Sequence, residues 1–492
     1  MAGHPSPIAR KNLLWLGAAL AGFGMLAFYK LGTAAMWLDE LMALYFSDRT
    51  LADLVQSLRA DVHAPLYYLA LMGCVKSLGI SEWTTRLPGV LFGAATVAAL
   101  FFLALRLAGR RVAVFAALIL ALSPFFIENA REARPYSLSA LMATLSWILF
   151  LRVLHGGRWR AAIGYGLACA LLMLTFYLGI AIIASQVLLA AARPLAWRKR
   201  RRLLAAWTGS AGLFLLAWGP LLYTQLFARD AFRQNWLVAR YPDGIRPQHV
   251  LSAVGEVYFG TLGRNLSPHL LWSLTAGVSL AGWWLIVRRN AAPTRRRGFP
   301  LARRIALWAF WGPLALYVAI CLVKPIFWPR YLTMCAPFAA LFLAAALARM
   351  PRKAGVLLLA LMPLGALTSY RAYQASLPRE DWRGAARAIL AGIKPTDVIV
   401  TDNLNARPCL AYYCEWFGRP DLARNMFTFT QFYQQTRGRY PYADRTLWFV
   451  ESKPQGQAQQ RQLLHAVNVA TGRTALEAGF VLETFHGMSG AP

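Results

Sequence analysis

The chain has 492 residues, of which 58% are hydrophobic and 15% are charged, and its formal net charge is +31. Soluble globular proteins average about half apolar residues or less, so the composition excludes an ordinary soluble domain. A basic chain often binds nucleic acid, but here the cations gather in acid-free clusters between apolar runs, as in "RLAGRR" and "RPLAWRKRRR". This pattern is typical of the positive-inside rule of membrane proteins, and we expect no nucleic-acid partner.

Apolar runs recur from the N-terminus to residue 370, and most have the roughly 17–23 residues that a helix needs to cross a bilayer. We therefore predict a polytopic α-helical membrane protein with about 11 transmembrane helices. With the N-terminus in the cytoplasm, every basic cluster falls on the cytoplasmic side and all 21 acids fall on the other side. The predicted spans lie near residues 12–30, 86–108, 112–127, 134–153, 160–176, 178–193, 203–223, 269–287, 305–323, 331–348 and 354–370.

The first span and the loop after it differ from the other segments. The first span follows Arg10 and Lys11 like a signal peptide, but no small-residue cleavage site follows it, so we expect a retained helix. The apolar segment 64–79 is short for a span. If it crossed the membrane, every later span would change direction. We therefore predict an interfacial helix there, after a short helix at 51–60.

The sequence changes character after the last apolar run. We predict a transmembrane domain over residues 1–370 and a small extracytoplasmic α/β domain over 371–492. The stretch "EDWRGAARAILAGIKPTDVIVTD" predicts an amphipathic helix, a proline turn and a short strand, "RTLWFVES" predicts another strand, and "QGQAQQRQLLHAVNVA" predicts another helix. Cys409 and Cys414 stand five residues apart in this domain, and spacing alone leaves open whether they form a disulfide.

Two adjacent acids, Asp39 and Glu40, lie in the apolar stretch "AAMWLDELMALYFS" just after the first span. One interpretation is a pair of solvated acids at the start of a short helix. The other is a catalytic pair, because burial raises the pKa of a carboxyl group and a raised pKa suits a general base.

The stretch "PFFIENAREARPYSLSA" places four charged residues between the third and fourth predicted spans. Glu128 and Glu132 are four residues apart and would share one face of a helix, as Arg131 and Arg134 would approximately. This pattern fits a salt-bridged helix end. It also fits a second catalytic carboxylate facing the first across a cleft, with Arg134 available to an anionic ligand.

Two outer segments supply further candidates. In "KPIFWPRY", prolines hold Lys324 and Arg330 at the outer ends of consecutive spans. Both side chains would snorkel to the interface, or they would hold a phosphate at headgroup depth, where arginine binds with two parallel hydrogen bonds. In "DVHAPLYY", His63 taken alone is more often structural than catalytic.

These motifs in this order resemble the multi-spanning GT-C glycosyltransferases. The chain is most similar to the bacterial family 39-like enzymes, which are related to protein O-mannosyltransferases and to the aminoarabinose transferase acting on lipid A. The matching stretches are "WLDE", "HAPLYYL", "EWTTRLPGVLFG", "REARPYSL", "PRYL" and "EDWRGAARAI", within residues 10–400. The family often has His-Pro-Pro where this chain has His-Ala-Pro. The lectin-like repeats of the eukaryotic protein O-mannosyltransferases are absent from this sequence.

The resemblance implies roles for individual residues. It implies that Asp39 and Glu40 are catalytic, with Glu132 as a third acid, although several relatives have Asp there. It also implies that Arg330 and Tyr331 contact the donor phosphate. In the matching motifs, the substrate-binding candidates are His63, Tyr67 and Tyr136, and the further phosphate-binding candidates are Lys324 and Arg134.

The resemblance implies a polyprenyl-phosphate-linked monosaccharide as the donor. We expect Asp39 to act as general base on an acceptor hydroxyl at the outer face of the inner membrane, in an inverting displacement. The acceptor is a glycolipid, a polysaccharide or a protein. The sequence requires no cofactor, although clustered outer carboxylates are compatible with a divalent metal. The alternatives are a transporter or flippase of lipid-linked sugars, or a non-catalytic envelope assembly protein.

Overall fold

The computed structural model describes residues 7–59, 61–227, 241, 243–288, 299–375, 380–395, 397–402, 406–436, 446–451, 469–477 and 480–487. The chain divides into two compact units. Unit 1 consists of Met1–Tyr29, Phe46–Ile80 and Thr84–Ala375, and unit 2 consists of Lys30–Tyr45, Ser81–Trp83 and Ser376–Pro492. The domain boundary drawn after residue 370 from the sequence stays a prediction.

Unit 1 is helical. Within the described ranges, eight helices are long and apolar enough to cross a membrane, or nine if the helices α6 and α7, bent by 59°, form one span. The protein is therefore a multi-pass membrane protein, as predicted, while the number of about eleven spans stays a prediction. The eight are α1 (Pro7–Phe28), α5 (Glu82–Ala108), α8 (Tyr136–Leu154), α11 (Trp197–Phe227), α15 (Pro268–Val287), α16 (Phe299–Val323), η3 (Pro329–Cys335) continued by α17 (Ala336–Leu347), and α18 (Arg352–Ala375).

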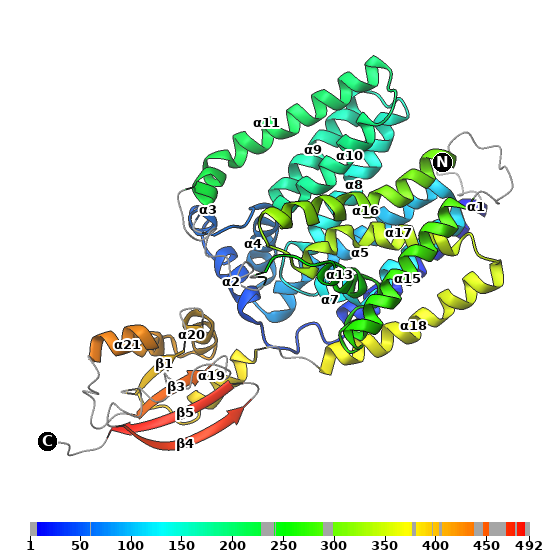
Figure 1. Ribbon diagram of the computed structural model, residues 1–492. Helices are drawn as coiled ribbons and strands as arrows, with labels where there is room; N and C mark the ends of the chain where they lie inside the picture. The colour runs from blue at the N-terminus through cyan, green and yellow to red at the C-terminus, as the bar shows by residue number, and fades with distance from the viewer. Residues whose placement is uncertain are drawn as a thin grey trace. The chain divides into compact units, whose positions relative to one another are not determined.

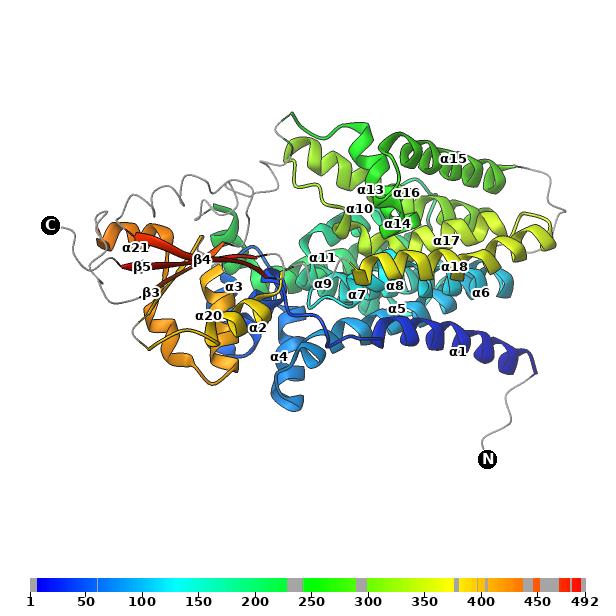
Figure 2. The ribbon, with the colours of Figure 1, turned by 90° about the horizontal axis from the view of Figure 1, so that it is seen from below.

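The remaining helices of this unit are shorter. The two helices predicted before and within the apolar segment 64–79 are confirmed as α3 and α4. Figure 1 shows α8, α9, α10 and α11 side by side. In Figure 2 the axes of α1, α17 and α18 lie broadly parallel to one another, whichever way the chain runs along them. The shorter helices are α3 (Leu51–Arg59), α4 (Leu66–Leu78), α6 (Arg110–Ala121), α7 (Pro124–Ala130), α9 (Trp159–Thr175), η1 (Tyr177–Gly179), α10 (Ile180–Ala191), α13 (Pro247–Phe259) and α14 (Thr261–Arg264), and α2 (Leu38–Ser47) belongs to both units.

The start of α7 is set by local sequence. Ser123 caps the helix by accepting a hydrogen bond from the Phe126 N–H at 3.3 Å. Pro124 takes the first helical position, where its missing N–H is not needed. The cap and the proline together explain why the chain bends after α6 instead of continuing as one straight span.

Unit 2 contains a five-stranded mixed sheet with the strand order β2-β1-β3-β5-β4, seen nearly edge-on in Figure 2. Strand β1 (Val398–Thr401) pairs in parallel with β2 (Met426–Thr428) and β3 (Thr446–Glu451). Strand β5 (Phe480–Gly487) pairs antiparallel with β3 and with β4 (Val469–Glu477). The helices of this unit are α19 (Trp382–Leu390), α20 (Ala406–Trp416), η4 (Pro420–Asn425) and α21 (Phe429–Thr436).

The sequence pattern explains the centre of this sheet. All four residues of β1 are buried, as expected for a β-branched strand with neighbours on both sides. Its side chains pack in a core with α21 and β3, formed by Val398, Val400, Phe429, Phe432, Leu447 and Phe449. The predicted helix after residue 380 and the strands β1 and β3 are confirmed. The further helix predicted at 455–470 lies outside the described residues over 455–468.

The two cysteines of α20 do not pair with each other. Cys409 and Cys414 are buried free thiols. Burial raises the pKa of Cys414 to about 11 and raises the pKa of Cys409 as well. The disulfide that the spacing left open is therefore not formed in this structure.

Candidate active site

The segment with Glu128 and Glu132 leaves the helical conformation earlier than predicted. Helix α7 ends at Ala130 with Arg131 as its C-cap, and the Arg134 N–H donates to the Glu132 carbonyl at 2.8 Å in the turn that follows. The expectation that Glu128 and Glu132 share a helical face is therefore wrong. The proline after Arg134 explains the difference, because a residue before proline disfavours the helical conformation.

Arg131 has a structural role. Its Nη1 donates hydrogen bonds to the carbonyl oxygens of Leu26, Ala27 and Tyr29 at 3.0, 3.1 and 2.7 Å and to the Tyr370 hydroxyl at 2.7 Å. The last carbonyls of a helix have no partner within that helix, and a cation stabilises that end. Arg131 thus caps α1 and links it to α18.

Glu132 forms an ion pair with Arg330. Its Oε2 lies 3.6 Å from Nη1 of Arg330, and the two side chains are only 4% and 16% exposed. The loop before Arg330 is fixed by Tyr317, whose hydroxyl donates to the Ile326 carbonyl at 3.2 Å and accepts from the Trp328 N–H at 2.9 Å. The prediction that the outer loop presents Arg330 rigidly is supported by these contacts.

Two further ion pairs, both made by Arg264, lie beside α7. Arg264 contacts Glu128 at 3.1 Å and Glu256 at 3.2 Å. Burial raises the pKa of Glu256, although the charge of Arg264 and its hydrogen bond act in the opposite direction. The charge of Arg330 also lowers the pKa of Glu256, so the three ion pairs belong to one electrostatic cluster with three carboxylates and two guanidinium groups.

The turn between Glu256 and Arg264 depends on Gly260. Its φ is +62°, and a Cβ there would lie 2.6 Å from the Pro124 side chain and 3.1 Å from the Phe125 backbone nitrogen. Only glycine allows both the conformation and the close approach to α7. The candidate residues chosen from the sequence did not include Glu256 or Arg264. The sequence pattern that would have indicated them is an acid, Glu256, and an arginine, Arg264, each four residues from Gly260.

His63 lies between an acid and an arginine. Its Nδ1 is 3.0 Å from the Asp61 carboxylate, and its Nε2 is 3.0 Å from Nη2 of Arg134. A guanidinium only donates, so Nε2 accepts and Nδ1 holds the proton toward Asp61. Burial raises the pKa of Asp61, but the hydrogen bonds from His63 and the Val62 N–H and the charge of Arg134 outweigh burial and hold that pKa below its usual range.

Buried polar groups also hold the backbone of this loop. The Gln225 amide donates to the carbonyl oxygens of Leu58 and His63 at 2.7 and 3.3 Å. The Tyr177 hydroxyl donates to the Gln225 side-chain oxygen at 2.8 Å and accepts from the Trp218 indole at 2.6 Å. Helix α11 and the segment before α10 therefore fix the position of His63.

The aromatic candidates form two clusters. The ring centroids of Tyr136 and Tyr331 are 6.3 Å apart. The ring centroid of Phe176 lies 6.3 Å from that of Tyr136 and 5.2 Å from that of Tyr331. Tyr67 is fully buried against Tyr68, with centroids 5.7 Å apart. The structure thus brings Tyr136 next to Tyr331, as a shared site requires, while Tyr67 packs inside unit 1.

Asp39 and Glu40 lie in unit 2, in the first turn of α2. Glu40 is 1% exposed. Both acids begin a short helix, where negative charge interacts favourably with the helix dipole, but the burial of Glu40 does not fit a pair of solvated acids. The catalytic interpretation stays open. That Asp39 approaches Glu132, and that Lys324 faces the same space as Arg330, stay predictions.

An apolar cavity of about 260 Å³ lies beside the charged cluster. Its walls come from α6, α7, α13, α14, α15, α17 and α18, and include Pro124, Tyr258, Phe259 and Leu262. Two of these residues stand within three positions of Glu256. Within the described part of the chain, no group of three His, Cys, Asp or Glu side chains has the arrangement of a metal site.

The apolar helices of unit 1 define a multi-pass membrane protein. A family model described as dolichyl-phosphate-mannose-protein mannosyltransferase matches residues 62–224. Two crystal structures of ArnT from Cupriavidus metallidurans have the same fold, and the chain is 14% identical to both. None of the curated proteins matches the chain significantly.

The match to ArnT extends over nearly the whole of both chains. The apo structure has a TM-score of 0.60 and covers 97% of this chain and 98% of ArnT. The structure bound to undecaprenyl phosphate has a TM-score of 0.58 and covers 96% and 97%. The resemblance to GT-C glycosyltransferases expected from the motifs is thus confirmed.

Proposed function

We propose that the protein is a glycosyltransferase that moves a monosaccharide from a polyprenyl-phosphate donor to an acceptor hydroxyl at the outer face of the inner membrane. The GT-C fold and the mannosyltransferase family match support this class. The observation that carries the proposal is the buried pair of Glu132 and Arg330. A guanidinium has five N–H donors in a planar fork that matches the oxygens of a phosphate, and a carboxylate beside it fixes its position.

The donor phosphate binds Arg330, with Lys324 and Arg134 as further cations and Tyr331 beside them. Burial lowers the pKa of Lys324, and an anion bound beside it would favour its charged form. The apolar cavity next to the charged cluster accommodates the first isoprene units of the donor. The ArnT structure with undecaprenyl phosphate supports this choice of lipid.

The reaction is a single displacement at the anomeric carbon. Asp39 accepts the proton of the acceptor hydroxyl as the oxygen forms its bond to that carbon. The bond from the anomeric carbon to the phosphate oxygen breaks, its electron pair stays on the phosphate, and Arg330 stabilises the new charge. Glu40 orients Asp39, and Glu132 binds the sugar or assists the base. Attack opposite the leaving group inverts the anomeric centre.

Substrate contacts come from three further residues. His63 reaches a sugar hydroxyl or the phosphate in the tautomer that Asp61 and Arg134 set. Tyr67 and Tyr136 contribute to binding the sugar and the lipid. The acceptor is a glycolipid, a polysaccharide or a protein, and the extracytoplasmic C-terminal domain shapes that choice.

The test is a transfer assay with purified protein and a panel of polyprenyl-phosphate sugars. We expect one donor to lose its sugar, and Asp39→Asn to reduce the rate by about 100-fold or more, as for loss of a general base. The control is Asp48→Asn, an exposed acid close by in sequence, which should keep the wild-type rate. A folded wild-type protein that transfers no sugar from any donor would contradict the proposal, as would an active Asp39→Asn variant.

A further inference from the structure

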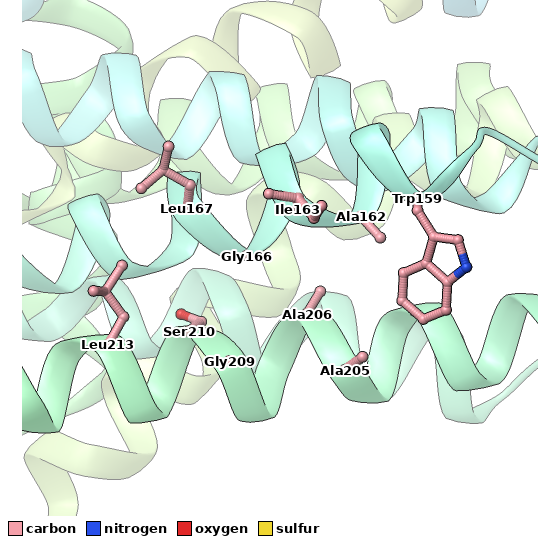
Figure 3. Close-up of a pocket in the computed structure, with 10 residues that line it drawn as sticks. All are labelled: Trp159, Ala162, Ile163, Gly166, Leu167, Ala205, Ala206, Gly209, Ser210 and Leu213. Atoms are coloured by element: carbon pink, nitrogen blue, oxygen red, sulfur yellow. The ribbon is translucent and has the colours of Figure 1, made fainter.

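A groove of about 300 Å³ lies between α9 and α11 in unit 1. Figure 3 shows small residues at its floor, where Gly166 faces Ala206, and apolar side chains along its sides. Ile163 and Leu213 on these sides are 67% and 44% exposed. An apolar, open groove on a membrane helix pair accommodates a hydrocarbon chain.

One end of the groove is basic. Trp159 closes it there, and the guanidinium carbons of Arg201 and Arg202 lie 5.6 and 5.9 Å from the centre of its ring. Arg202 and Lys199 also donate to the Gly157 and Leu154 carbonyls at 2.8 and 2.7 Å. Arg201 is exposed.

No acid occurs in the sequence between Glu132 and Asp230. The basic cluster, which is "RKRRR" at 198–202 with Arg158 and Arg160, therefore receives no balancing carboxylate from α8, α9, α10 or α11. A basic site between transmembrane helices is suited to an anionic lipid headgroup, and an arginine next to a tryptophan suits the interface, where aromatic rings prefer to lie.

We infer that this groove binds one anionic phospholipid, with its phosphate on Arg201 beside Trp159 and one acyl chain along α9 and α11. The small residues alone would also admit a helix of a second protein. Charge decides between the two occupants, because an apolar helix would leave the basic cluster unbalanced and a lipid phosphate does not. The inference is independent of the proposed transfer reaction.

The experiment is native mass spectrometry of the purified full-length protein with added phosphatidylglycerol or phosphatidylcholine. We expect one tightly held phosphatidylglycerol per chain and weaker phosphatidylcholine binding. Arg201→Gln should reduce phosphatidylglycerol affinity about fivefold, the effect of one cation near a lipid headgroup. The matched control is Arg288→Gln, because Arg288 also lies over a tryptophan, 4.5 Å from the Trp284 ring, but outside the groove.

A second pair of variants tests the acyl-chain groove. A Cβ at Gly209, which lines the groove, or at Gly212, which does not, meets no atom within 4 Å. Gly209→Leu should therefore fill the groove and reduce lipid retention, while Gly212→Leu on the same helix should not. Equal retention of the two lipids, or equal losses in a variant and its control, would overturn the inference. A change of oligomeric state in Gly209→Leu instead would show a partner helix in the groove.

Discussion

The carboxylate of Glu380 accepts a hydrogen bond from the Leu38 backbone N–H at 3.0 Å, one residue before Asp39. The same carboxylate accepts from the Trp382 indole at 2.9 Å. The Tyr413 hydroxyl accepts from the Met36 N–H at 2.8 Å. Residues from the C-terminal part of unit 2 therefore fix the start of α2 and, with it, the backbone of the acid pair.

Loss of the Glu380 contact should displace Asp39 and Glu40 while leaving both carboxylates in place in the sequence. We expect Glu380→Ala to reduce kcat/KM of sugar transfer about 10- to 100-fold, because small displacements of catalytic groups have effects of that size. Glu380→Gln keeps an acceptor oxygen and should restore most of the activity. Glu415→Ala on the exposed face of α20 is the control. A Glu380→Ala variant with wild-type kinetics would show that the contact does not position Asp39.

Arg264 should stabilise the folded protein most while Glu128 and Glu256 are both charged. Arg264→Gln leaves Glu128 and Glu256 buried without their cation, so we expect a loss of about 1–3 kcal/mol in the free energy of unfolding. Adding Glu128→Gln removes one of the uncompensated charges and should recover part of the loss. The measurement is a double-mutant cycle from detergent-solubilised unfolding curves. Strictly additive effects would mean that the two residues are not coupled.

Gly260 should tolerate no side chain. Gly260→Ala forces a residue with a Cβ into positive φ and brings that Cβ against Pro124, so we expect a loss of about 2–4 kcal/mol. Gly156 has a φ of +90° with nothing within 4 Å of its Cβ position. Gly156→Ala should therefore lose only the backbone contribution of about 1 kcal/mol. Thermal unfolding compares the two, and equal losses would refute the close contact with α7.

The hydrogen bond between His63 and the Asp61 carboxylate should make stability depend on acid pH. The folded-state pKa of Asp61 lies below that of the unfolded chain, which is about 4. Its contribution is therefore present above pH 4 and is lost as the pH falls through the folded-state pKa. Asp61→Asn should lower Tm at pH 7, and its difference from the wild type should shrink below about pH 4. Asp48→Asn should show no such convergence, and a pH-independent difference for Asp61→Asn would contradict the stabilising role of the Asp61 carboxylate.

The fold was largely predictable because bilayer-length apolar runs and basic clusters are local features. The short helices α3 and α4, the strand β1 and the helix α19 follow from equally local patterns. The number of spans was less predictable, since the cap at Ser123 and the proline after it bend one apolar run. In addition, α9 and α10 have fewer residues than the eight candidate spans.

The site was only partly predictable because its partners are distant in sequence. Motifs selected Glu132 and Arg330, and the structure pairs them across about two hundred positions. No local pattern links Glu128 to Arg264, or shows that Arg131 caps α1. Likewise, one domain boundary placed after residue 370 cannot show that Lys30–Tyr45 belongs to the same unit as the C-terminal sheet.

The proposed function requires that the acid pair and Glu132 line one site, which is a prediction. Cross-linking with a short thiol-reactive reagent tests it directly in membranes, using Asp39→Cys with Glu132→Cys and, as control, Asp48→Cys with Glu132→Cys. Peptide mass spectrometry should find the 39–132 product in high yield and the 48–132 product at background level, with protection of the first by undecaprenyl phosphate. A 39–132 yield no higher than that of the control pair would contradict the shared site and the glycosyl-transfer mechanism built on it.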